Sequence, residues 1–100
     1  MPGAIASYEA ALRIDNQDGN TMLNLGTAYQ ANKMLPKALD SYLRALQVDA
    51  KLHDAHYFLG TVYEGLNRKP QAVEEYKKYL IAQPAGTYSA DAKERLKLLK

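Results

Sequence analysis

Residues 56–84 read HYFLGTVYEGLNRKPQAVEEYKKYLIAQP, and residues 22–50 read MLNLGTAYQANKMLPKALDSYLRALQVDA. The two stretches begin 34 residues apart, and at matching places both contain Leu-Gly-Thr, a tyrosine, a proline and a second tyrosine. A fixed spacing shared by so many positions indicates one supersecondary unit that is used more than once. Stacked units of this kind build a long surface that suits another chain, so the spacing bears on function as well as on fold.

The same spacing reaches back to the start of the chain. Tyr8, Tyr42 and Tyr76 are evenly spaced. Four further triplets keep the interval: Ala4, Ala38 and Ala72; Ile5, Leu39 and Val73; Leu12, Leu46 and Leu80; and Pro2, Pro36 and Pro70. The unit therefore recurs along most of the chain.

Apolar residues recur at helical spacing in six segments of the chain. The predicted helices cover residues 4–15, 21–32, 37–49, 54–66 and 71–82, and a last one runs from Thr87 or Ser89 to about Leu99. Asp18 and Asn20 are placed to cap the second helix. Short turns join the helices, which implies antiparallel neighbours. We therefore predict an all-α fold, a right-handed α-solenoid of antiparallel helix pairs.

Gly26 and Gly60 fall inside two of the predicted helices. A glycine there costs about 1 kcal/mol relative to alanine, so its repeated use suggests a repeated need. A missing side chain lets a neighbouring helix approach closely. Ala38 and Ala72 are the small residues expected to meet the two glycines.

The composition is that of an ordinary soluble protein, with 47% hydrophobic and 24% charged residues. The net charge of +2 is too small for a nucleic-acid binder that depends on neutralising phosphates. The chain has no cysteine, which excludes disulfides and thiolate zinc sites. No apolar run approaches the ~18 residues of a membrane span, and the chain does not open with a signal-peptide pattern. A soluble chain without membrane insertion is predicted, in a compartment left open.

Few residues suggest chemistry. His53 and His56 could share a helix face, but a metal site needs further ligands and only Asp54 is close in sequence. Packing or surface roles are therefore favoured for both histidines. The acidic and basic residues at 74–78 resemble a solvated helix face. Because no nucleophile with a base and no phosphate-binding loop can be assembled, we predict no enzyme activity, no metal and no cofactor.

The repeated positions resemble the tetratricopeptide repeat, a 34-residue helix–turn–helix unit whose pattern runs W-x2-L-G-x2-Y, then A, F or Y, A and P. One copy here consists of Met22, Leu25, Gly26, Tyr29, Ala38, Tyr42, Ala45 and Ala50. The next consists of His56, Leu59, Gly60, Tyr63, Ala72, Tyr76, Tyr79 and Pro84. The tryptophan is absent, Ala50 and Asn16 replace the proline, and Tyr79 stands in a small-residue slot, which questions close packing at the C-terminal junction.

The resemblance implies one domain over residues 1–100. It divides into a half repeat at 2–18, full repeats at 19–52 and 53–86, and a capping helix at 87–100. In the last helix, charged residues replace the repeat's leucine, glycine and tyrosine, whereas Tyr88, Ala92, Leu96 and Leu99 still form an apolar stripe. A polar outer face is what the end of a solenoid requires.

In this family the first helix of each repeat lines a concave face, so the resemblance implies a non-enzymatic scaffold that binds a peptide or protein segment there. The expected groove residues are Asn20, Leu23, Asn24, Thr27, Gln30, Asp54, Tyr57, Phe58, Thr61, Glu64 and Arg95, with Asp91 beside the last. Some members hold a C-terminal carboxylate with paired Asn and Lys or Arg side chains. Asn24 fits one such position, but Asp54 and Phe58 replace the basic residues, so this mode is not expected. Whether Tyr57 and Phe58 contact a partner or pack between repeats is left open.

A second predicted function belongs to another class. Ile5, Tyr8 and Leu12 form an apolar stripe on the first helix, and no preceding helix covers its outer side. Exposed contiguous apolar surface usually marks an interface. The alternative is therefore a structural self-assembly module, with a possible homodimer through this N-terminal edge.

Overall fold

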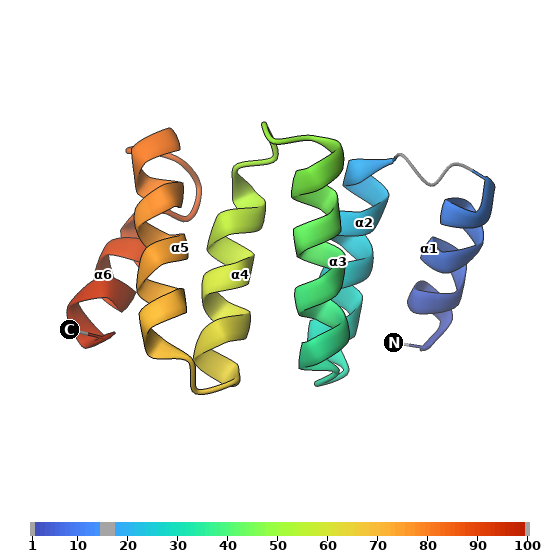
Figure 1. Cartoon of the computed structure of the whole chain (residues 1–100), viewed down its shortest axis with the longest axis horizontal. Coiled ribbons are helices and arrows are strands. Elements are labelled where there is room, and N and C mark those ends of the chain that lie inside the picture. Colours follow the sequence, from blue (N-terminus) through green and yellow to red (C-terminus); the bar gives the residue numbers. More distant parts are fainter. Residues whose placement is uncertain (1, 15–17, 100) are drawn as a thin grey trace.

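The computed structural model describes residues 2–14 and 18–99. Within these ranges it contains no strand and six helices: α1 (Pro2–Ile14), α2 (Gly19–Ala31), α3 (Leu35–Val48), α4 (Asp54–Gly65), α5 (Lys69–Ala82) and α6 (Ser89–Leu99). The helices follow one another along the long axis of the molecule, each packed on its neighbours in sequence (Figure 1). The predicted all-α helical solenoid is confirmed, and no helix end differs from its prediction by more than two residues. The division into a half repeat, two repeats and a cap stays a prediction.

The start of α2 is fixed by Asp18, as predicted. Its carboxylate accepts hydrogen bonds from the Thr21 hydroxyl at 2.7 Å and from the Thr21 backbone N–H at 3.1 Å. These bonds favour the ionised form and hold the pKa of Asp18 below its usual value. The bonded N–H is one that has no partner inside the helix.

Two identical turns join α2 to α3 and α4 to α5. Lys33 and Asn67, one unit apart, adopt positive φ angles of 60° and 59°. The following residue donates its N–H to a tyrosine carbonyl at 2.8 Å in both turns, from Met34 to Tyr29 and from Arg68 to Tyr63. This is the Schellman pattern, which satisfies the carbonyls at a helix end and reverses the chain.

Gly26 and Gly60 make room for tyrosine rings. A Cβ atom added to Gly26 would lie 2.5 Å from Tyr42 Cε1, and one added to Gly60 would lie 2.6 Å from Tyr76 Cε1. Both tyrosines are fully buried. The expected close approach is present, and the three atoms nearest to each added Cβ belong to the tyrosine ring of the facing helix. Contact between the glycines and Ala38 or Ala72, one helical turn before the tyrosines, stays a prediction.

The junction between α5 and α6 accommodates Tyr79 in the slot where a small residue was expected. The Tyr79 ring is fully buried, and its hydroxyl accepts a hydrogen bond from the Tyr88 backbone N–H at 3.0 Å. Tyr88, Leu96 and Leu99 pack around Tyr79 and Ala92, so the predicted apolar stripe of the last helix faces α5. Close packing is therefore retained at this junction.

His56, Glu75 and Lys78 form a polar group between α4 and α5. His56 Nδ1 lies 2.8 Å from Glu75 Oε1, and the ring nitrogen donates because an ionised carboxylate can only accept. Lys78 Nζ donates to Glu75 Oε2 at 3.3 Å. Burial by itself raises the pKa of Glu75, but the hydrogen bond from His56 and the charge of Lys78 outweigh burial and hold the pKa below its usual value.

The Glu75→Gln variant is expected to be less stable than the parent at pH 7, and this difference should shrink in acid. The carboxylate's contribution is fully present above its ordinary pKa of 4.5 and is lost as the pH falls through the lowered pKa of the folded state. Urea denaturation at pH 7 and at about pH 3 measures both differences. A constant difference between parent and variant would show that Glu75 does not contribute to the acid sensitivity.

Candidate functional site

A row of hydrogen-bonded side chains links α2, α3 and α4. Gln30 accepts a hydrogen bond from the buried Tyr42 hydroxyl at 2.9 Å and donates from Nε2 to the Thr61 hydroxyl at 2.8 Å. Thr61 in turn donates to the Phe58 carbonyl at 2.7 Å. Burial raises the pKa of Tyr42 to about 12, so its hydroxyl remains a donor at neutral pH. The row holds Gln30 and Thr61 in fixed orientations.

The same row recurs one unit later with charged groups. The Tyr76 hydroxyl donates to Glu64 Oε1 at 2.6 Å, and Arg95 Nη1 on α6 lies 3.6 Å from Glu64 Oε2. Each of these residues stands 34 positions after its counterpart in the first row. Burial and the hydrogen bond to Glu64 raise the pKa of Tyr76. Two polar rows therefore follow one another along the molecule, the first linking α2 and α3 to α4 and the second linking α4 and α5 to α6.

We call the surface of α2, α4 and α6 the α2–α4–α6 face. The predicted groove residues all belong to these three helices: Asn20, Leu23, Asn24, Thr27, Gln30, Asp54, Tyr57, Phe58, Thr61, Glu64, Asp91 and Arg95. The first row brings residues 30 and 61 together, and the second brings residues 64 and 95 together. Thr27 joins the first row through the Tyr42 hydroxyl at 3.3 Å, and Asn24 is exposed. The role of these residues in binding stays a prediction.

An aromatic cluster lies where α4 meets the segment before α6. The rings of Tyr57 and Tyr88 are stacked, with centroids 4.4 Å apart and planes 8° apart. Phe58 stacks on the buried Tyr42 at 5.5 Å and meets Tyr88 edge-on at 5.3 Å. The Tyr57 hydroxyl donates a hydrogen bond to Asp91. Burial, and to a smaller extent this bond, raises the pKa of Tyr57. Tyr57 and Phe58 thus both take part in packing, and both keep partly exposed surface.

A small cleft of about 250 Å³ lies at the end of the face where α2 and α4 begin. Three of the predicted groove residues line it, together with the turn before α4 and the end of α5. The lining consists of Asn20, Leu23, Lys51, Leu52, His53, Asp54 and Gln83. Asp54 therefore sits beside His53 and Lys51 and lies outside the two hydrogen-bonded rows.

The predicted N-terminal edge lies largely against the core. Ile5, Tyr8 and Leu12 are half-buried and pack on the cluster that contains Leu25 and Tyr29. Among the side chains that the structure describes, the large hydrophobic ones that are exposed belong to α3, α5 and α6, at Leu43, Ile81 and Leu98. Self-association through α1 stays a prediction, and no particular observation favours it.

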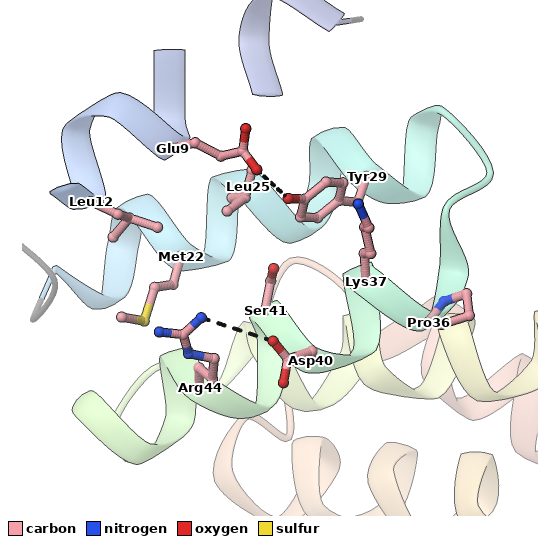
Figure 2. A pocket seen from close by; sticks show the side chains of 10 residues that line it. All are labelled: Glu9, Leu12, Met22, Leu25, Tyr29, Pro36, Lys37, Asp40, Ser41 and Arg44. Atoms are coloured by element: carbon pink, nitrogen blue, oxygen red, sulfur yellow. Dashed lines mark hydrogen bonds and ion pairs between the residues drawn. The ribbon is translucent and has the colours of Figure 1, made fainter. Parts of the chain in front are cut away.

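A larger cleft, which the sequence patterns did not predict, lies between α1, α2 and α3. Figure 2 shows the side chains around it, two from α1, three from α2 and five from α3. Its volume is about 690 Å³ and its lining is Glu9, Leu12, Met22, Leu25, Tyr29, Pro36, Lys37, Asp40, Ser41 and Arg44. The sequence contains one signal of this cleft: the side chain of Ser41 is smaller than that of its counterpart in the next unit, Glu75.

Residues 2–14 and 18–99 contain no group of three or more His, Cys, Asp or Glu side chains placed to hold a metal ion. His56 is instead bonded to Glu75, while His53 lines the small cleft. Over the same residues, no helix has the length and apolar character needed to cross a membrane.

Comparison with known proteins adds a sequence match and a fold match. Residues 53–85 match the family model described as the tetratricopeptide repeat. No curated protein matches the chain in sequence. The matched range contains α4 and α5 with the Schellman turn between them.

Several solved structures are similar to the whole chain. The TPR domain of Arabidopsis OM64 superposes with a TM-score of 0.87 at 21% identity, over 94% of this chain and 78% of that one. MamA gives a TM-score of 0.87 at 26% identity over 98% of this chain, which spans 56% of the MamA chain. The first TPR of Spaghetti (RPAP3), solved with the HSP90 peptide SRMEEVD, gives 0.87 at 19% identity, over 95% of this chain and 73% of that one. The resemblance is therefore confirmed: residues 53–85 form a tetratricopeptide repeat, and the chain has the fold of tetratricopeptide-repeat domains.

Proposed function

We propose that this chain is a non-enzymatic scaffold that binds a peptide or protein segment along its α2–α4–α6 face. The observation that carries the proposal is the pair of hydrogen-bonded rows, which restrain Gln30, Glu64 and Arg95 in the unbound protein. A restrained side chain loses less conformational freedom when a partner arrives than a mobile one does. Such a surface is suited to binding an extended chain.

A protein partner is supported by relatives in fold, one of which, the first TPR of RPAP3, was solved with an HSP90 peptide. That peptide, SRMEEVD, is acidic at its C-terminal end. We expect a different ligand here, because Asp54 and Phe58 stand where the resemblance would require basic residues.

The charges of the face favour a basic segment. Asp54 and Asp91 are exposed, and Glu64 is half-buried. Arg95, the cation among the predicted groove residues, already lies 3.6 Å from Glu64 and 3.7 Å from Asp91, whereas Asp54 lies at the other end of α4, beside Lys51. Among the predicted groove residues the three carboxylates outnumber the one guanidinium, which attracts lysine and arginine and repels an acidic segment. The partly exposed Tyr57 ring offers a surface on which a lysine or arginine side chain can stack.

Peptides that the parent selects from a random phage-displayed library are expected to be rich in lysine and arginine. The Asp54→Lys variant should bind a selected peptide about tenfold more weakly, or about 1.4 kcal/mol, because one carboxylate of the face is reversed. Glu74→Lys is the matched control, since it makes the same charge change at an exposed position of α5. Fluorescence anisotropy with the labelled peptide measures both affinities.

Three outcomes would contradict different parts of the proposal: the defined site, the charge preference and the scaffold function. Equal weakening by the two variants would show that net charge attracts the peptide without a defined site. Selected peptides without basic residues would contradict the charge preference. A failure to select any peptide would contradict the scaffold function itself.

A further inference from the structure

The large cleft between α1, α2 and α3 has a counterpart one unit later. Adding 34 to the number of each lining residue gives the corresponding position on α3, α4 or α5. Three of the corresponding pairs differ in a way that matters for the cleft: Met22 with His56, Ser41 with Glu75, and Arg44 with Lys78. The second unit therefore shows which side chain can occupy the position of this cleft.

In the second unit, formed by α3, α4 and α5, the carboxylate of Glu75 occupies the position that corresponds to the cleft. The Glu75 side chain, only 12% exposed, accepts hydrogen bonds from His56 at 2.8 Å and from Lys78 at 3.3 Å. The carboxylate lies between a donor on α4 and a cation on its own helix, α5. A groove of this shape therefore accommodates a carboxylate when a cation stands at the position of Lys78.

In the first unit the corresponding residue, Ser41, has no carboxylate. The cation of this unit, Arg44, has only a weak partner. Arg44 Nη1 lies 3.9 Å from Asp40 Oδ2, and the two side chains are 56% and 71% exposed. An exposed pair of this kind contributes little. Across the cleft, Glu9 already accepts the Tyr29 hydroxyl at 2.8 Å. The guanidinium is therefore more available to a new partner than the carboxylate of Glu9 is.

Apolar side chains lie beside this cation in the same cleft. Leu12, Met22 and Leu25 contribute to the lining, and Figure 2 shows them on the helices that face Arg44. The volume of about 690 Å³ lies within the range of roughly 300–1,000 Å³ that is typical of small-ligand sites. There is room for a charged side chain together with an apolar neighbour.

We propose that this cleft binds a glutamate side chain of a partner peptide. Its carboxylate takes the position that Glu75 occupies in the next unit and accepts hydrogen bonds from Arg44. An adjacent leucine-like side chain of the peptide rests on Leu12, Met22 and Leu25. The helix α2 contributes to both sites, but no residue that lines this cleft is among the predicted residues of the α2–α4–α6 face. The protein then carries two peptide sites of opposite charge preference.

The probes are a capped peptide of sequence Leu-Leu-Glu-Leu and its Leu-Leu-Gln-Leu counterpart. Each is titrated into the ¹⁵N-labelled full chain up to about 10 mM, a concentration that detects millimolar affinity. The glutamate peptide is expected to give saturable shifts at the backbone amides of Ser41 and Arg44. The glutamine peptide should bind about tenfold more weakly, because it cannot form a charge-assisted pair.

Three variants test the assignment. Arg44→Gln should weaken the glutamate peptide about tenfold. Asp40→Asn should tighten it by up to about threefold, because it removes the competing carboxylate. The double variant Met22→His and Ser41→Glu installs the residues of the second unit, so it should fold at least as stably as the parent and give no saturable shifts.

Several results would overturn the proposal. These are the absence of saturable shifts in the parent, equal affinity for the two peptides, unchanged binding in Arg44→Gln, or shifts confined to the α2–α4–α6 face. Peptide binding by a folded double variant would do the same. In the absence of peptide, the amide signals of Ser41 and Arg44 should not change with protein concentration. If they do, a second copy of the chain occupies the cleft and the proposal is wrong. Arg44→Gln changes an exposed side chain, so it decides the matter even if the double variant does not fold.

Discussion

Replacing Tyr76 with alanine is expected to destabilise the protein by about 3–5 kcal/mol, the usual cost of truncating a fully buried aromatic side chain. Tyr76 has no exposed surface and fills the space beside Gly60 between α4 and α5. Its loss leaves a cavity and also removes the hydroxyl that donates to Glu64 at 2.6 Å. Urea denaturation followed by circular dichroism measures the change. A loss below about 1 kcal/mol would show that the two helices close over the gap.

Two tyrosine-to-phenylalanine variants separate the hydroxyl from the ring. Tyr76→Phe removes a hydrogen bond to a carboxylate, worth about 1.5–3 kcal/mol, whereas Tyr42→Phe removes one that is shared between two neutral acceptors, the Gln30 amide and the Thr27 hydroxyl, and is worth about 0.5–1.5 kcal/mol. The two positions are equivalent in the repeat and equally buried, so each is the control for the other. Equal losses would show that the charge of Glu64 adds nothing to this bond.

The helices could be predicted from the sequence because their signals are local. Apolar residues at helical spacing mark each segment, and Asp18 caps α2 as its residue type suggests. The side chain that lies nearest to each glycine could not be predicted in the same way. The repeat indicates which helices meet, but the side chain that enters the gap depends on how far a ring reaches. The Tyr42 ring on α3 lies nearest to Gly26, whereas the sequence pattern suggested the smaller Ala38, one turn earlier on the same helix.

The candidate site could be predicted less completely than the fold. The resemblance placed Gln30, Thr61, Glu64 and Arg95 on one face, but the hydrogen bond between Gln30 and Thr61 and the ion pair between Glu64 and Arg95 depend on side-chain conformations across three helices. The large cleft was missed for a different reason. It exists where a side chain is short, at Ser41, and pattern analysis records which residues are apolar and not how much space they leave. A comparison of side-chain sizes between the two units would have revealed it.

Replacing Gly60 with leucine is expected to cost about 1–3 kcal/mol, because it overpacks a filled core. A Cβ atom at this position would lie 2.6 to 2.8 Å from three atoms of the Tyr76 ring, and that ring is fully buried. The loss should appear although leucine favours a helix by almost 1 kcal/mol over glycine. The matched control is Gly3→Leu in α1, where an added Cβ atom meets nothing within 4 Å. Its stability should equal or slightly exceed that of the parent.

A second change tests whether the clash with the ring is the cause. If it is, the double variant Gly60→Leu and Tyr76→Ala should lose less stability than the sum of the two single variants, because the new leucine enters the cavity that the tyrosine leaves. Strict additivity would mean that the leucine acts elsewhere, for example on the backbone of α4. A Gly60→Leu variant as stable as the parent would contradict the close approach at this glycine. The same test applies to Gly26 and Tyr42, where the added Cβ atom would lie even closer to the ring, at 2.5 Å.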